Sequence, residues 1–170
     1  MAQIAVVLGD ITQIGADVIV NAANRDLAPG AGVDGAIRAA GGPSITRETE
    51  KLGGVETGQA VATTAGDLPA SWVVHTAGPI WGSVTEEEAD TLLASCYRAC
   101  LDVAADLGAK SIAFPSISTG IFGYPLARAA SIATGTVKRR LENHPSALAS
   151  VTFVCFDEQT HRVYRDLLGV

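Results

Sequence analysis

The sequence predicts an α/β fold, with helices on both faces of a largely parallel sheet. Short apolar runs alternate with longer helical patterns through most of the 170 residues. Hydrophobic residues make up 48% and charged residues 18% of the chain, which is an ordinary globular composition. A chain of this length fits one core comfortably, so we expect a single domain over residues 1–170.

The first two strands are predicted by apolar runs. Residues 3–8 (QIAVVL) carry β-branched side chains and end at Gly9 and Asp10, which are turn residues. Residues 17–20 are nearly continuously apolar, which is typical of a strand buried on both faces.

Two short helices follow. Residues 33–40 show a helical pattern that stops at a pair of glycines, and residues 43–52 begin with Pro43 in the first turn. Residues 60–64 and 72–76 then read as strands.

A long helix is predicted to begin after Thr85, which with Glu88 forms a capping-box pattern, and to end at Gly108. Its apolar face has helical spacing and consists of Leu93, Cys96, Tyr97, Cys100, Ala104 and Leu107. The remaining elements are strands at residues 111–114 and 151–156 and helices at residues 126–142 and 159–168.

Charge and cysteine content restrict the function class. The net charge is −6 and the sequence pI about 4.9, so nonspecific binding to a nucleic-acid backbone is not expected. Three cysteines in a chain of this size favour a reducing compartment over a disulfide scaffold. No signal peptide or membrane span is recognisable, so we expect a cytoplasmic protein.

Ligands of α/β sheets bind beyond the carboxyl ends of the strands, so the loops after residues 20, 114 and 156 are expected to form the ligand site. The loop FPSISTGIFGYP (residues 114–125) combines glycines with a helix start and is a candidate diphosphate cradle. It matches neither the Walker nor the GxGxxG pattern. A tight strand-to-helix connection is the competing interpretation.

The earlier loop combines two amides, glycines and one acid. Asn21 and Asn24 suit either the end of a strand or contacts to sugar hydroxyls. Asp34 suits a helix N-cap, and its alternative role is to lie beside the reacting bond of a ligand.

Other polar and aromatic residues carry weaker signals. His75 lies in an apolar strand, and the histidines and cysteines show no zinc-like spacing, so no metal site is predicted. Phe156 is a candidate for stacking on a base, with packing in the core or at the sheet edge as the alternative. Asp10 is a candidate for a turn or for accepting from an exocyclic amine.

Several segments together resemble the macrodomain family, and within it the MacroD-type class. They occur in the family's order over nearly the whole chain and are GDIT (9–12), DVIVNAAN (17–24), GVDGAI (32–37), TGQAVAT (57–63), VVHTAGPIW (73–81), SIAFPSISTGIFGYP (111–125) and VTFVCFDE (151–158). The resemblance implies a three-layer α/β/α sandwich around a mixed sheet of about six strands. It also implies binding of ADP-ribose with no metal or other cofactor.

The family's site residues fall on matching positions of this chain. By resemblance, Asp10, Ile11 and Phe156 hold the adenine, and Gly32 and Val33 hold the diphosphate from the first loop. In the second loop Ser118, Thr119, Gly120, Ile121 and Phe122 hold it through backbone N–H groups, and Phe122 also helps to orient the distal ribose. Asn24 and Asp34 are the implied catalytic residues at the distal ribose, and Asn21 an implied ligand-binding residue.

The activity implied by the resemblance is hydrolysis of mono-ADP-ribose from acidic side chains, by attack of water at the anomeric carbon. Mono-ADP-ribosylated proteins would then be the partners. Three alternatives remain: a noncatalytic ADP-ribose reader, a deacetylase of O-acetyl-ADP-ribose, and a hydrolase of ADP-ribosylated nucleic-acid ends. Pro29 and Ala31 depart from the family's glycine run, which predicts a stiffer first loop.

Overall fold

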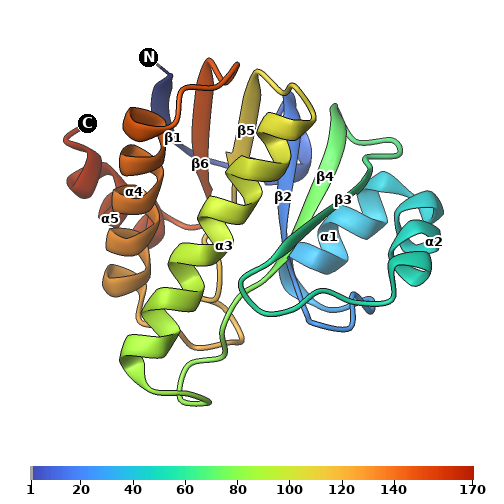
Figure 1. Ribbon diagram of the computed structural model, residues 1–170, viewed down its shortest axis with the longest axis horizontal. Helices are drawn as coiled ribbons and strands as arrows, with labels where there is room; N and C mark the ends of the chain where they lie inside the picture. The colour runs from blue at the N-terminus through green and yellow to red at the C-terminus, as the bar shows by residue number, and fades with distance from the viewer. Residues whose placement is uncertain (1) are drawn as a thin grey trace.

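A six-stranded mixed sheet forms the centre of the computed structural model, which describes residues 2–170 (Figure 1). Its strand order is β1-β6-β5-β2-β4-β3. All neighbours pair in parallel except β3 and β4, which are antiparallel. The strands are β1 (Gln3–Leu8), β2 (Ala16–Ala23), β3 (Ala60–Thr64), β4 (Ala70–Ala77), β5 (Ser111–Phe114) and β6 (Ser150–Cys155).

Helices cover both faces of the sheet. They are α1 (Gly32–Gly41), α2 (Pro43–Leu52), α3 (Glu86–Asp106), α4 (Leu126–Asn143) and α5 (Glu158–Leu168), with a 3₁₀ turn, η1 (Ile11–Gln13). One face packs against α3, α4 and α5, and the other against α1 and α2 (Figure 1). The predicted three-layer α/β/α sandwich is therefore confirmed.

Successive side chains of β2 point to opposite faces of the sheet and so contribute to the core on both sides. Val18 and Val20 face the larger cluster under α3 and α4, whereas Ile19 faces the cluster under α1 and α2. Because both faces are covered, residues 18–20 at the centre of β2 are all apolar, as expected for a central parallel strand.

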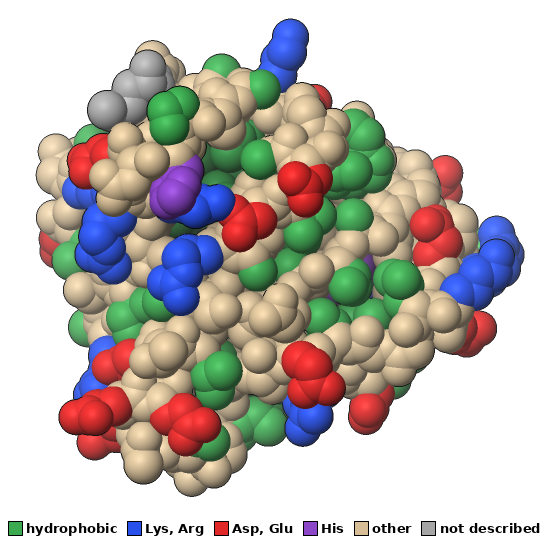
Figure 2. Space-filling model, viewed as in Figure 1, with side chains coloured by type: hydrophobic (Ala, Val, Ile, Leu, Met, Phe, Trp, Pro, Cys, Tyr) green, Lys and Arg blue, Asp and Glu red, His purple; other side chains and the backbone are tan. Residues whose placement is uncertain are grey.

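The face formed by α3 and α4 carries both signs of charge (Figure 2). Acidic side chains gather over the start of α3, whose first turn contains Glu86, Glu87 and Glu88. Thr85 caps this helix as predicted, since its hydroxyl accepts a hydrogen bond from the amide of Glu88 at 3.1 Å. Carboxylates at a helix N-terminus are favourable because they oppose the helix dipole.

Several elements differ from the sequence prediction at their ends, and three differences lie beside the strand ends that matter for a ligand site. β2 continues to Ala23 because Asn21 pairs with His75 of β4 in the sheet register. β6 ends at Cys155, so Phe156 lies beyond the strand. The turn η1 was not predicted, and it begins where the carboxylate of Asp10 accepts from the amide of Thr12 at 2.9 Å.

No helix among residues 2–170 is both long enough and apolar enough to span a bilayer.

Candidate functional site

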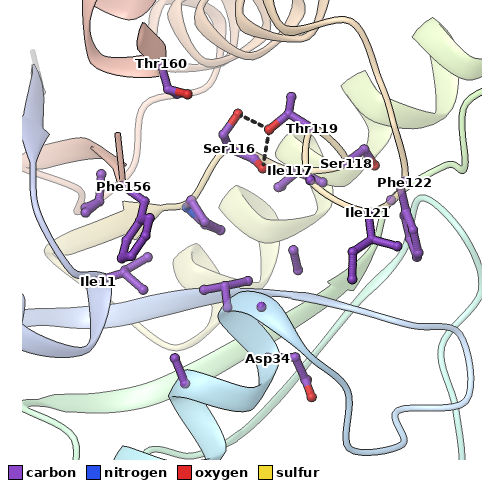
Figure 3. Close-up of a pocket in the computed structure, with 18 of the residues that line it drawn as sticks. Ile11, Asp34, Ser116, Ile117, Ser118, Thr119, Ile121, Phe122, Phe156 and Thr160 are labelled. Carbon is purple, nitrogen blue, oxygen red and sulfur yellow. Dashed lines mark hydrogen bonds between the residues drawn. The ribbon is translucent and has the colours of Figure 1, made fainter. Parts of the chain in front are cut away.

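A cavity of about 670 Å³ opens beyond the carboxyl ends of the parallel strands, where ligands of α/β sheets bind. Its walls come from the connections after β1, β2, β5 and β6. This volume suits a ligand of nucleotide size. In Figure 3, Phe156 and Ile11 lie at one end of the cavity and Ile121 and Phe122 at the other.

The second loop presents backbone donors to the cavity. Two hydrogen bonds close the loop, from the amide of Gly123 to the carbonyl of Gly120 and from the amide of Tyr124 to that of Ser118. Within residues 2–170, the amide N–H groups of residues 118–122 have no protein acceptor. These groups suit an anion such as a diphosphate.

Ser118 has an unusual conformation in this loop, with φ at +66°. Its hydroxyl is buried and has no hydrogen-bond partner among the described residues. The loop approaches β4 so closely that a Cβ on Gly78 would lie 2.1 Å from the Ser118 hydroxyl oxygen. Gly78 therefore allows the second loop to take this position.

The first loop reaches the cavity from the opposite side. Ala31 is extended at φ −93° and ψ −175°, and Gly32, at φ +63°, opens α1. The first amides of α1 lack partners within the helix and add donors beside those of the second loop. Of the two departures from the family pattern, Ala31 therefore introduces no backbone strain, because only Gly32 takes the left-handed conformation here.

Asp34 is not the helix N-cap, because that position belongs to Ala31. It lies in the first turn of α1, is 3% exposed and lines the cavity. Its Oδ2 accepts from the amide of Gly30 at 2.7 Å and from Nε of Arg38 at 3.0 Å. Its Oδ1 accepts from Nδ2 of Asn21 at 2.7 Å. Three donor atoms therefore define the position of this carboxylate.

Arg38 was not identified from the sequence, although it lies four residues after Asp34, where helical side chains meet. Its guanidinium is buried and bonds to the hydroxyls of Thr46 and Thr49 and to the carbonyl of Leu27. All its terminal nitrogens have acceptors, so the charge is fully paired in the interior.

Asn21 and Asn24 have different environments. Asn24 lines the cavity, and its amide bonds to both the carbonyl and the N–H of Ala28, at 2.8 and 3.0 Å. Asn21 is completely buried and is absent from the cavity wall. The structure therefore places Asn21 behind Asp34, where it contacts the acid in place of the expected ligand.

Phe156 and Asp10 lie at the end of the cavity beside Ile11. Phe156 is 85% exposed, and neither sheet nor helix packs over it. It lies beside Ile11 at this end of the cavity (Figure 3). Oδ1 of Asp10 accepts from both the amide and the hydroxyl of Thr12. These two hydrogen bonds fix the orientation of the Asp10 carboxylate at the start of η1. The exposure of Phe156 excludes core packing of this ring.

His75 lies in β4 behind Asn21 and is completely buried. Burial, assisted by the positive charge of Arg38 and opposed by Asp34, lowers the pKa of His75 from 6.5 to about 4. Within residues 2–170, no cluster of three or more His, Cys, Asp or Glu side chains is arranged to hold a metal ion.

The sheet order and this cavity define an α/β nucleotide-binding domain. Comparison with known proteins identifies the family, since the family profile described as Macro domain matches residues 20–133. The chain belongs to the macrodomain family.

Similar sequences and structures agree with this assignment. The chain is 49% identical to a "Macro domain-containing protein" of Streptomyces nogalater, over 99% of this chain and 93% of that one. It is 51% identical to an "O-acetyl-ADP-ribose deacetylase" of Enterobacter cloacae, over 98% and 93% of the two chains.

Among solved structures, a variant of the Oceanobacillus iheyensis macrodomain with ADPR superposes with a TM-score of 0.92 at 38% identity, covering 96% of this chain and 90% of that chain. The Trypanosoma brucei macrodomain in complex with ADP-ribose gives a TM-score of 0.91 at 40% identity, covering 98% and 69% of the two chains.

The buried ion pair between Asp34 and Arg38 predicts strong thermodynamic coupling. Arg38→Ala should lower the free energy of unfolding by about 3–5 kcal/mol, because it leaves a buried carboxylate without its counter-charge. Urea denaturation of Arg38→Ala, Asp34→Ala and the double variant measures the coupling, and the double variant should lose less than the sum of the single losses. The exposed pair Arg25–Glu56, with side chains 66% and 80% exposed, is the matched control. Its removal should cost no more than about 1 kcal/mol, and equal losses at the two pairs would contradict the prediction.

Burial of neutral His75 predicts a pH dependence of stability. Because its pKa is lower in the folded state, the unfolded chain binds more protons between pH 6.5 and 4. The contribution of neutral His75 to the free energy of unfolding is therefore complete above pH 6.5 and is lost as the pH falls toward 4. Relative to His75→Asn, the native protein should lose roughly 3 kcal/mol of unfolding free energy between pH 7 and pH 4. Parallel curves for the two proteins in denaturant titrations across this range would refute the assignment.

Proposed function

We propose that the cavity binds ADP-ribose and that the protein hydrolyses ester links between its distal ribose and a carboxylate. The solved relatives with ADPR and ADP-ribose support the ligand. Phe156 would stack on the adenine, and Asp10 would accept from its amino group. Asn24, Phe122 and Asp34 would surround the distal ribose at the other end of the cavity.

Backbone N–H groups would bind the diphosphate, which lies between the adenine and the distal ribose. The net charge of −6 would repel a phosphate at long range, and no lysine or arginine lines the cavity among the described residues. N–H groups from the start of α1 and from the second loop supply short-range donors on either side.

The environment of Asp34 is the observation that supports hydrolysis. A carboxylate offers about four acceptor positions, and Asn21, Gly30 and Arg38 fill three of them. The carboxylate borders the cavity, so one position remains for a water molecule beside the distal ribose. Three fixed donors hold the acid in place before the ligand arrives, which lowers the cost of orienting that water.

The proposed substrate is an ADP-ribosylated Asp or Glu side chain. Water oxygen bonds to the anomeric carbon while the bond from that carbon to the ester oxygen breaks, and the electron pair leaves with the carboxylate. The water proton passes to Asp34 or to the ligand's own phosphate. A carboxylate leaves readily without protonation, so the site needs to position water and stabilise charge more than it needs a strong acid.

O-acetyl-ADP-ribose is the second candidate substrate, because relatives from Enterobacter cloacae and Klebsiella pneumoniae, at 51% and 50% identity, are named O-acetyl-ADP-ribose deacetylases. It also joins a carboxylic acid to the distal ribose, so the same end of the cavity would receive the ester. A reader that binds without turnover is the alternative in which Asp34 has no chemical role.

Release of free ADP-ribose tests the proposal. The protein should release it from a Glu-modified protein and from O-acetyl-ADP-ribose, and not from Ser- or Arg-modified proteins. Asp34→Asn should reduce turnover by roughly 100-fold or more, by analogy with the loss of a fixed charge-stabilising group. This variant is preferable to Asp34→Ala because it keeps side-chain volume beside Arg38.

Asp26→Asn, an exposed acid outside the cavity wall, is the matched control and should retain turnover. Calorimetric titration with ADP-ribose should show comparable affinity for both variants. Binding with no turnover by the native protein would support the reader, and no binding would reject the ligand.

A further inference from the structure

We propose that His75 is a positioning residue for the proposed reaction: through a single tautomer it fixes the amide of Asn21, which in turn holds Asp34 toward the cavity. This inference rests on the proposed function for its kinetic consequence. The relay lies wholly behind the cavity wall, because neither His75 nor Asn21 lines the cavity.

Three adjacent strands build the relay. Thr63 on β3 pairs with Val73 on β4, which lies two residues before His75 and so on the same face of the strand. His75 pairs in register with Asn21 on β2. The Thr63 hydroxyl lies 2.9 Å from Nε2 of His75, and Nδ1 of His75 lies 3.0 Å from Nδ2 of Asn21. The same Asn21 nitrogen is 2.7 Å from Oδ1 of Asp34. All four side chains are buried, so water does not replace these partners.

The hydroxyl of Thr63 determines the tautomer of His75. Its proton is directed at the carbonyl of Thr64, 2.9 Å away, so its oxygen is left to accept from His75. His75 therefore carries its proton on Nε2, and Nδ1 is the acceptor that faces Asn21.

The carboxylate and the imidazole together determine the orientation of Asn21. Its Nδ2 group donates one proton to Asp34 and the other to Nδ1 of His75. Rotating the amide by 180° would place its oxygen against Oδ1 of Asp34, so that two acceptors would face each other. Oδ1 of Asn21 has no partner among the described residues, so the amide keeps both donor contacts at the expense of its own acceptor.

A neutral imidazole is required for this arrangement. Protonated His75 would place an Nδ1–H group against the Asn21 NH₂ group, with two donors facing each other. The charges of Arg38 and Asp34 act on the protonation of His75 in opposite directions. Its lowered pKa agrees with the neutral state at physiological pH.

Thr63→Val tests the relay with one substitution of nearly equal volume, far from the ligand. It removes the acceptor that selects the Nε2–H tautomer, and it leaves the cavity wall unchanged. We expect kcat on the Glu-linked substrate to fall by roughly 10- to 100-fold, as for other residues that orient a catalytic group. The Kd of free ADP-ribose should stay within about twofold, because uniform binding is unaffected. Thr63→Ser, which restores the hydroxyl, should recover most of the rate.

Thr136→Val is the matched control. Thr136 is a buried threonine on α4 whose hydroxyl has no partner among the described residues, and it is outside the relay. This variant should keep kcat. An equal loss of kcat in Thr63→Val and Thr136→Val, at equal changes in melting temperature, would show a general stability effect and overturn the proposal.

Nitrogen-15 chemical shifts of the His75 ring test the tautomer directly in the native protein and need no turnover. Long-range ¹H–¹⁵N spectra between pH 5 and pH 8 should show a constant Nε2–H tautomer, and Thr63→Val should change it. An Nδ1–H or protonated ring in the native protein would overturn the relay even if hydrolysis is observed. If the expected tautomer is found and no substrate is cleaved, the proposed function fails while the relay stands. If hydrolysis is seen and Thr63→Val keeps the native kcat, the positioning role is rejected.

Discussion

The buried ion pair of Asp34 and Arg38 is the interaction on which the rest of the site depends. Two charges in the interior are tolerated only when both are fully hydrogen-bonded. Arg38 meets this condition through Thr46, Thr49 and Leu27, and thereby connects α1 to α2 and to the segment after β2. The first loop is anchored to the same carboxylate through Gly30. One electrostatic requirement therefore determines where α1 begins and where the loop faces the cavity.

The same requirement limits the chemistry. A carboxylate that already accepts from three donors is suited to orienting a water molecule and to stabilising positive charge on a sugar ring. An ester of a carboxylic acid is the substrate class that needs little more than this. The diphosphate is left to backbone N–H groups, which suits an acidic protein whose cavity wall lacks cationic side chains among the described residues.

Local sequence signals predicted most elements. The spacing of apolar residues, the helix-capping residues and the glycines that end helices all determine structure within a few residues. The strands at residues 3–8, 60–64 and 111–114 and the helix at residues 43–52 were predicted with the bounds that the structure shows. Both loops that line the cavity were also predicted. The relay was not, because it requires the cross-strand register that brings His75 beside Asn21. Asn21 looked equally suited to a ligand, since nothing local distinguishes an amide facing a cavity from one facing the core.

The site of water attack is the most direct test of the proposal that Asp34 directs water to the anomeric carbon. Hydrolysis of a Glu-ADP-ribosylated peptide in H₂¹⁸O, followed by mass spectrometry of the released peptide, measures it. Attack at the sugar carbon leaves the glutamate unlabelled, because its carboxylate departs with both original oxygens. One ¹⁸O in the glutamate carboxylate would show attack at the ester carbonyl and would contradict the proposed role of Asp34.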